Sequence, residues 1–306
     1  MTELTPPLVL SSDEAMVLLT LGDVTVEGRI TTASNATLYC RISDGDHVAA
    51  CVYKPVSGER ELWDYPDGTL AEREFAAYLV GQAIGWNVVP PTVLREGPLG
   101  TGMVQLWIAD DESFDVIGAI NSGANRTLQR IAVFDAVVNN SDRKVSHLLG
   151  LPTTTPLPVP TPLPTTTPLP VPTPLPTTTR LPVPTPLPTT TRLPVPTPLP
   201  VPTSVPMPAP GDVRHIYGID HGVSFSVEDK LRTVLWQWAG DPIPDDAIEC
   251  LTGLSEQLSD DLGERLADLL TNAEVRATRR RVTRLLRTGR FPLPPTDWPA
   301  VPYPPY

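Results

Sequence analysis

The sequence predicts an α+β protein of two lobes, in which a strand-rich lobe precedes a mostly helical one. Three short runs of β-branched and aromatic residues, separated by turn sequences, indicate a three-stranded meander at residues 24–30, 36–42 and 47–55. Residues 244–289 instead follow the pattern of two or three helices. Strands therefore dominate the first part of the chain and helices the last.

The segment between these regions contains two further predicted helices and two further predicted strands. Residues 69–85 carry apolar side chains near helical spacing and end at Gly85, a suitable helix stop. Residues 125–139 show a second helical pattern. Strands are expected at residues 86–96 and 102–109, and the second is so apolar that we expect it to be buried.

A proline-rich repeat interrupts the predicted C-terminal lobe. TTTPLPVPTPLP begins at Thr153 and returns at Thr165, Thr177 and Thr189, with one proline replaced by arginine in the last two copies. Proline at nearly every second position excludes a helix or a central strand, so we expect a disordered insertion with local polyproline II conformation. This composition also allows a partner that binds proline-rich segments.

The expected domain organisation follows from these patterns. Residues 1–13 are predicted to be a flexible tail and residues 14–108 an N-terminal lobe. Residues 109–306 are predicted to be a C-terminal lobe, interrupted by the disordered repeat at residues 152–210.

Charge and cysteine content narrow the functional classes. The chain has 23 lysines and arginines against 35 aspartates and glutamates, a formal charge of −12, which argues against nucleic-acid binding. Cys40, Cys51 and Cys250 show neither metal-ligand spacing nor a disulfide framework, which favours a reducing cytoplasm. No apolar stretch approaches the roughly 20 residues of a membrane span. We therefore expect a cytoplasmic protein without a transmembrane segment.

Phosphoryl transfer from ATP requires few parts, and the first half of the sequence offers candidates for those that hold the phosphates. A lysine neutralises phosphate charge, a carboxylate orients the lysine, and a loop covers the phosphates. Lys54 ends the third predicted strand, and Glu74, or alternatively Glu72, lies on the helix that follows. Ser34 and Asn35 lie in the turn after the first strand, where backbone amides can cover phosphates.

The remaining parts of such a site have candidates on either side of the repeat. Asp142 begins the sequence DRKVSH, with Lys144 two residues and His147 five residues after it. Protein kinases have the same spacing between the catalytic aspartate, a lysine and a metal-binding asparagine, so His147 stands where they have asparagine. Asp220, in the sequence IDHG, follows a predicted strand and is a candidate Mg²⁺ ligand.

These pieces, in this order, resemble the phosphoinositide 3-/4-kinase superfamily, especially the type II phosphatidylinositol 4-kinases and related bacterial proteins. The matching motifs are VYKP, REFAAYLVGQAIG with VVPPT, GMVQLWI, NNSDRKVSH and YGIDHGVSF. Residues 231–240 also resemble a family of actinobacterial proteins assigned to this kinase-like group. The resemblance implies a two-lobed kinase-like fold with ATP in the cleft beneath the meander and GMVQLWI as the hinge strand.

The resemblance also implies the residues of the site. The candidate ATP-binding residues are Lys54, Glu74, Ser34, Asn35, Gln105 and Trp107. The candidate catalytic residues are Asp142 and Lys144, and the candidate Mg²⁺ ligands are Asp220 and His147.

The sequence leaves the reaction itself open at two points. The phosphoryl acceptor is a lipid, a protein or a small molecule, and nothing in the sequence distinguishes them. Imidazole suits Mg²⁺ less well than oxygen ligands do, so His147 places the second metal position and catalysis in question. The alternatives are a nucleotide-binding pseudokinase and a scaffold that acts through the proline-rich repeat.

Overall fold

The computed structural model describes residues 12–30, 33, 35–111, 113–152 and 213–306. The chain divides into two units, Met1–Leu163 with Ala209–Tyr306, and Pro164–Pro208. All described residues belong to the first unit. The repeat, with the predictions of disorder and polyproline II conformation made for it, lies outside the described residues.

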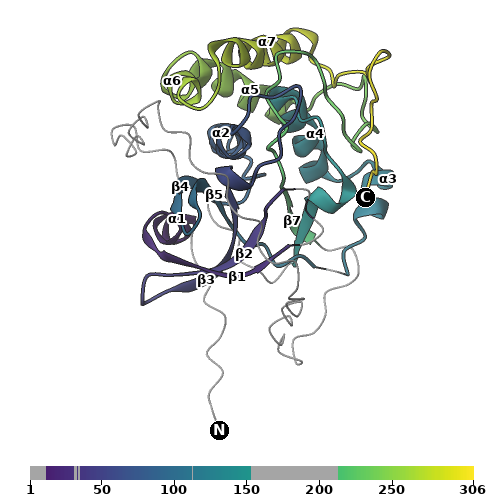
Figure 1. Cartoon of the computed structure of the whole chain (residues 1–306). Coiled ribbons are helices and arrows are strands. Elements are labelled where there is room, and N and C mark those ends of the chain that lie inside the picture. The colour runs from purple at the N-terminus through teal and green to yellow at the C-terminus, as the bar shows by residue number, and fades with distance from the viewer. Residues whose placement is uncertain (1–11, 31–32, 34, 112, 153–212) are drawn as a thin grey trace. The chain divides into compact units, whose positions relative to one another are not determined.

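A five-stranded antiparallel sheet contains the predicted meander. The strands lie in the order β1 (Asp23–Arg29), β2 (Leu38–Ser43), β3 (Val48–Pro55), β5 (Gly100–Leu106) and β4 (Thr92–Gly97) (Figure 1). The first three correspond to the predicted strands with ends shifted by a few residues. In the register of β3 and β5, Lys54 lies opposite Met103 and Val52 opposite Gln105.

One helix near the N-terminus is absent from the sequence prediction. Helix α1 (Ser12–Leu21) buries Leu18 and Leu19 in the apolar cluster that also contains Cys40 and Ile42 of the sheet. Its start and stop signals are present, because acidic residues occupy its first turn and Gly22 follows its last residue. The tail predicted for residues 1–13 therefore extends too far, since the helix begins at Ser12.

Helix α2 (Leu70–Ala83) and helix α4 (Arg126–Val138) lie where the sequence predicts helices. Asn125 caps α4 with its side-chain oxygen, which accepts a hydrogen bond from Leu128 N. Asn139 ends the helix in the left-handed conformation, with a φ of 55°. The remaining helices are α3 (Val116–Ser122), α5 (Asp245–Leu258), α6 (Asp261–Ala267) and α7 (Asn272–Thr288).

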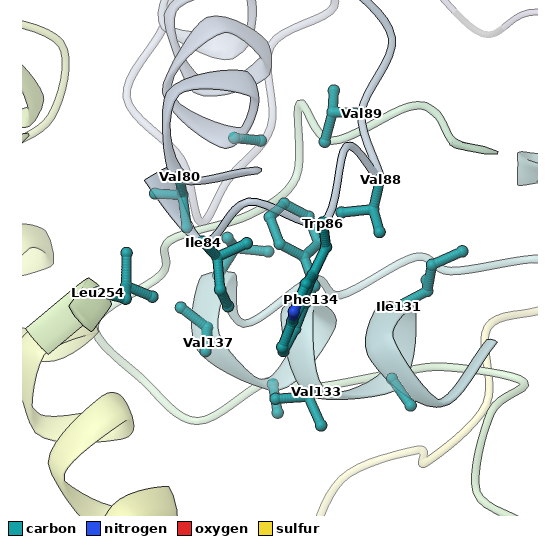
Figure 2. Close-up of a cluster of buried hydrophobic side chains, with 14 of the residues drawn as sticks. Val80, Ile84, Trp86, Val88, Val89, Ile131, Val133, Phe134, Val137 and Leu254 are labelled. Carbon is teal, nitrogen blue, oxygen red and sulfur yellow. The ribbon is translucent and has the colours of Figure 1, made fainter. Parts of the chain in front are cut away.

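The main apolar core lies among the helices. Figure 2 shows Val80 of α2, and Ile84 just after it, close to Phe134 and Val137 of α4, with Leu254 of α5 beside them. These five side chains are at most 3% exposed. Each buried side chain of this kind stabilises the fold by about 1.5–3 kcal/mol. This core holds α2 against α4. It therefore also fixes the buried polar residues that the two helices carry, Glu74 on α2 and Asp135 on α4.

A separate two-stranded sheet carries the segments on either side of the repeat. The short 3-10 turn η2 (Val145–His147) leads into β6 (Leu148–Pro152), which pairs antiparallel with β7 (Val213–Gly218). The pairing brings Leu148 opposite Gly218, so the segments around Asp142 and Asp220 meet at one end of this hairpin. A second 3-10 turn, η1 (Val56–Gly58), follows β3.

No helix in the described part of the chain combines the length and apolarity needed to cross a membrane.

Candidate functional site

Lys54 lies at the end of β3 and joins two remote carboxylates. Its Nζ donates to Oε1 of Glu74 at 2.6 Å and to Oδ1 of Asp220 at 2.8 Å. Burial opposes the charge, but the two carboxylates prevail and raise the pKa of Lys54 above its ordinary value. The ammonium group is therefore charged and fixed between two acids.

Glu74 of α2 is held from both sides. Its side chain is 2% exposed, and its second oxygen accepts a hydrogen bond from His221 N at 2.8 Å. The neighbouring Arg73 is also buried and pairs with Glu274 of α7 at 2.7 Å. Burial raises the pKa of Glu74, and the Lys54 ammonium opposes that rise. The pairing predicted for Glu74, rather than for Glu72, is the one present in the structure.

Asp220 lies two residues beyond β7 in a backbone conformation that is uncommon for non-glycine residues. Its φ is 63°, in the left-handed region, which aspartate adopts more readily than most residues. Its Oδ1 accepts from Lys54, and its Oδ2 lies 3.4 Å from Nε2 of His147. The Lys54 ammonium holds the pKa of Asp220 well below its usual range, against the opposing effect of burial. Asp220 is thus an ionised carboxylate with half of its side chain open to solvent.

His147 ends the turn η2 and is 8% exposed. Burial lowers its pKa to about 4, so the ring is neutral at physiological pH and can donate a nitrogen lone pair. The described residues contain no group of three or more histidine, cysteine or acidic side chains that could enclose a metal ion. Two protein donors still fit a cation that phosphate oxygens also hold, because nucleotide-bound Mg²⁺ normally has few protein ligands.

Asp142 and Lys144 form a local pair. Oδ2 of Asp142 lies 3.0 Å from Nζ of Lys144, and both side chains are about a quarter exposed. The backbone N–H of Asp142 donates to Oδ1 of Asn140 at 2.9 Å, which fixes the loop. Burial raises the pKa of Asp142, while Lys144 opposes the rise. An aspartate of this kind can orient a hydroxyl or receive its proton.

A buried polar network beneath these residues is absent from the sequence prediction. Arg143 is fully buried and pairs with Asp135 of α4, with Nη2 and Oδ1 2.8 Å apart. Its guanidinium also donates to Ile219 O at 2.8 Å and to Nε2 of His221 at 2.6 Å. Arg143 therefore connects the Asp142 loop with the segment of Asp220. The sequence signal for this network is Asp135, an aspartate on the apolar face of a predicted helix.

Gln105 and Trp107 lie on the same face of the sheet as Lys54. Cross-strand partners point to the same face, and Gln105 lies opposite Val52, two residues from Lys54. Gln105 is buried and its Nε2 donates to Oγ1 of Thr92 at 2.9 Å. Trp107 is 41% exposed and packs edge-on against Tyr39, with ring centroids 5.1 Å apart.

Of the two turn residues predicted to cover phosphates, only Asn35 belongs to the described part of the chain. Ser34 lies outside the described residues. Asn35 uses its side-chain oxygen to accept a hydrogen bond from Arg60 N at 3.0 Å, which ties the turn to the segment after η1. The contact of Asn35 with a nucleotide stays a prediction.

Comparison with known proteins identifies the relatives of this chain. No family model matches the chain. It is 35% identical over 327 aligned residues to Protein Rv2133c of Mycobacterium tuberculosis, covering 94% of this chain and 96% of that protein. The chain therefore belongs to the same family as Rv2133c.

A solved structure shows the class of fold. The Golgi casein kinase with Mn/ADP bound superposes with a TM-score of 0.50 at 12% identity, covering 90% of this chain and 75% of that one. The likeness shows a kinase-like fold, which agrees with the α+β kinase-like class predicted from the sequence.

Proposed function

We propose that the protein is an ATP-dependent phosphotransferase of the phosphoinositide-kinase-like superfamily. The observation that carries the proposal is the position of Lys54, bonded at once to Glu74 of α2 and to Asp220 after β7. A lysine held in this way presents a fixed positive charge for phosphate oxygens, with an ionised carboxylate beside it for a divalent cation. The similar Golgi casein kinase, whose structure has Mn/ADP bound, supports the same combination of nucleotide and cation.

Each polar residue of the site then has a role. Lys54 binds phosphate oxygens and Glu74 orients it. Asp220 and His147 hold the cation, for which the sequence predicts Mg²⁺ and which neutralises the charge that develops on the phosphoryl group. Asp142 orients the acceptor hydroxyl and takes its proton as the acceptor oxygen bonds to the γ-phosphorus, the bond from that phosphorus to the β–γ bridging oxygen breaks and ADP leaves. Lys144 steadies Asp142.

The two parts of the chain have separate tasks in this proposal. Residues 12–108, which include all of α1, form the ATP-binding lobe, with Gln105 and Trp107 lining the nucleotide site on the face of Lys54. Residues 109–306, apart from the insertion at 152–210, form the lobe that carries Asp142, His147 and Asp220. The acceptor is a lipid, a protein or a small molecule in a cytoplasmic setting.

Label transfer from ATP tests the proposal directly. The full chain is incubated with γ-labelled ATP and Mg²⁺ or Mn²⁺, beside Asp220→Ala, and both hydrolysis and labelled products are measured. We expect the wild-type protein to release or transfer label and Asp220→Ala to fall to background. Equal rates in both proteins would contradict the assigned role of Asp220.

A nucleotide-binding pseudokinase is the second candidate, and His147 is the observation that favours it. In that case ATP raises the melting temperature of the protein but no label is transferred or hydrolysed with either ion. A role of the repeat in binding a partner is a separate prediction. It requires that deletion of residues 152–210 removes the partner and leaves ATP binding intact.

A further inference from the structure

His147 and Asp220 bring a nitrogen donor and an oxygen donor together. Nε2 of His147 lies 3.4 Å from Oδ2 of Asp220. Two ligands at neighbouring corners of an octahedron lie roughly 3 Å apart when each is about 2.1 Å from the ion. The observed separation is close to that of two ligands of a single ion.

Within the described part of the chain, the ring of His147 makes one polar side-chain contact, through Nε2 with Asp220. Its Nδ1 is buried and has no hydrogen-bond partner there. An ion held at Nε2 gives Nδ1 no partner, so it is the position of Nε2 beside Asp220 that supports ligation. The polar contact that His147 does make is directed at Asp220.

An imidazole nitrogen discriminates between the divalent ions that accompany nucleotides. Mg²⁺ prefers oxygen ligands and near-ideal octahedral geometry. First-row transition ions bind imidazole, with affinity that rises from Mn²⁺ towards Cu²⁺, and Mn²⁺ also accepts the carboxylate oxygens that suit Mg²⁺. An asparagine at this position would offer an amide oxygen, which suits both ions.

We infer that His147 makes this site select Mn²⁺, as the first-row ion that shares the oxygen ligands of Mg²⁺, over Mg²⁺ itself. The inference rests on the proposed function, because the ion is the one that accompanies the nucleotide phosphates. It replaces the Mg²⁺ predicted from the sequence and makes His147 the residue that determines ion specificity.

Pulsed electron paramagnetic resonance of bound Mn²⁺ tests the inference without any substitution at the site. Full-length protein is saturated with Mn²⁺ and ADP, once with natural histidine and once with ¹⁵N-histidine. We expect the modulation of a directly bound ¹⁴N nucleus, which changes to that of ¹⁵N on labelling. Labelling histidine alone separates a histidine ring from the nitrogens of adenine, and the variants below identify which histidine it is.

A matched histidine serves as the control. His47 lies in the turn before β3 and pairs with Asp44 at the surface, 3.2 Å away. His47→Asn should keep the nitrogen modulation, and His147→Asn should lose it. Bound Mn²⁺ and ADP without histidine modulation in the wild-type protein would overturn the inference and leave the proposed function intact.

Affinity supplies a second measurement. Calorimetry gives the dissociation constant of ADP with Mg²⁺ and with Mn²⁺ for the wild-type protein and for His147→Asn. For each protein, the dissociation constant with Mg²⁺ is divided by that with Mn²⁺. The wild-type ratio is then divided by the ratio of the variant, which cancels the preference of the nucleotide itself. We expect this quotient to be roughly tenfold, in line with the effect of ligand changes at metal sites.

The outcomes separate the two proposals. A quotient near one overturns the selectivity of His147 even if ADP binds well. If His147→Asn fails to fold, His147→Gln, which also offers an amide oxygen, takes its place in both measurements. If neither ion promotes binding of ADP to the wild-type protein, the proposed function fails and this inference fails with it.

Discussion

Lys54 and Lys144 each pair with carboxylates in the candidate site, but the two pairs are built in opposite ways. Lys54 meets residues 20 and 166 positions away in the chain, and Glu74 at its side is nearly inaccessible to solvent. Lys144 meets a carboxylate two residues away on a partly exposed loop. The first pair therefore depends on the whole fold, whereas the second requires only a local loop conformation.

Asp220, paired with Lys54, and Asp142, paired with Lys144, also have pKa values shifted in opposite directions. The Lys54 ammonium lowers the pKa of Asp220, whereas burial raises the pKa of Asp142. The first acid is kept ionised, as a cation ligand requires, and the second is brought closer to a range where protons are exchanged. Asp220 is therefore suited to binding a cation, and Asp142 is suited to accepting a proton.

Lys54→Met should have the largest effect, because it leaves Glu74 buried without its cation. Breaking a buried pair by removing one partner costs about 3–5 kcal/mol of folding free energy. Lys144→Met should cost at most about 1 kcal/mol, as for exposed pairs. Urea unfolding of both variants measures the difference. Equal losses would show that the two pairs do not differ in their dependence on the fold.

Asp142→Asn should separate binding from chemistry. We expect the turnover of ATP to fall roughly 10²-fold, as for loss of a general base, with the affinity for nucleotide unchanged. Asp220→Asn should instead weaken the binding of nucleotide with its cation. Steady-state rates and calorimetry on the same two preparations test this, and a matched loss of affinity in Asp142→Asn would remove the distinction.

Lys144→Met should have the smallest effect at neutral pH, within about tenfold. Its effect should appear in the pH profile. Lys144 lowers the pKa of Asp142, so its removal raises that pKa further above the ordinary value. Because the reaction needs the ionised form of Asp142, the acid limb of the rate profile should shift to higher pH. A shift to lower pH would contradict the pairing.

The residues of the candidate site could be predicted from the sequence better than the buried residues that hold them in place. Lys54, Glu74 and Asp220 could be found because each stands beside a predicted element in a known order. Arg143 and His221 could not, since their role depends on contacts with Asp135 and Glu74 that only the packed helices create. The hydrogen bond of Gln105 to Thr92 could likewise not be predicted, because it follows from strand pairing and not from spacing in the sequence.

The fold shows the same division between local and long-range information. The helix of residues 126–138 has a marked amphipathic pattern and an asparagine cap at each end, and the helix of residues 70–83 is followed by Gly85 with a positive φ, so the sequence predicts both. Helix α1 lies on the sheet through Leu18 and Leu19, and its short apolar run has a weak local pattern. Its place depends on the apolar surface that β2 and β3 offer, which is a property of the assembled sheet.

Arg73 and Glu74 give α2 two neighbours that lie on separate elements. Arg73 pairs with Glu274 of α7 and Glu74 pairs with Lys54 of β3, so α2 connects α7 to Lys54, the proposed phosphate ligand. Coupling between two sites is reciprocal in free energy. If a ligand that shifts α7 changes the affinity of the proposed site for nucleotide, nucleotide changes the affinity for that ligand by the same factor.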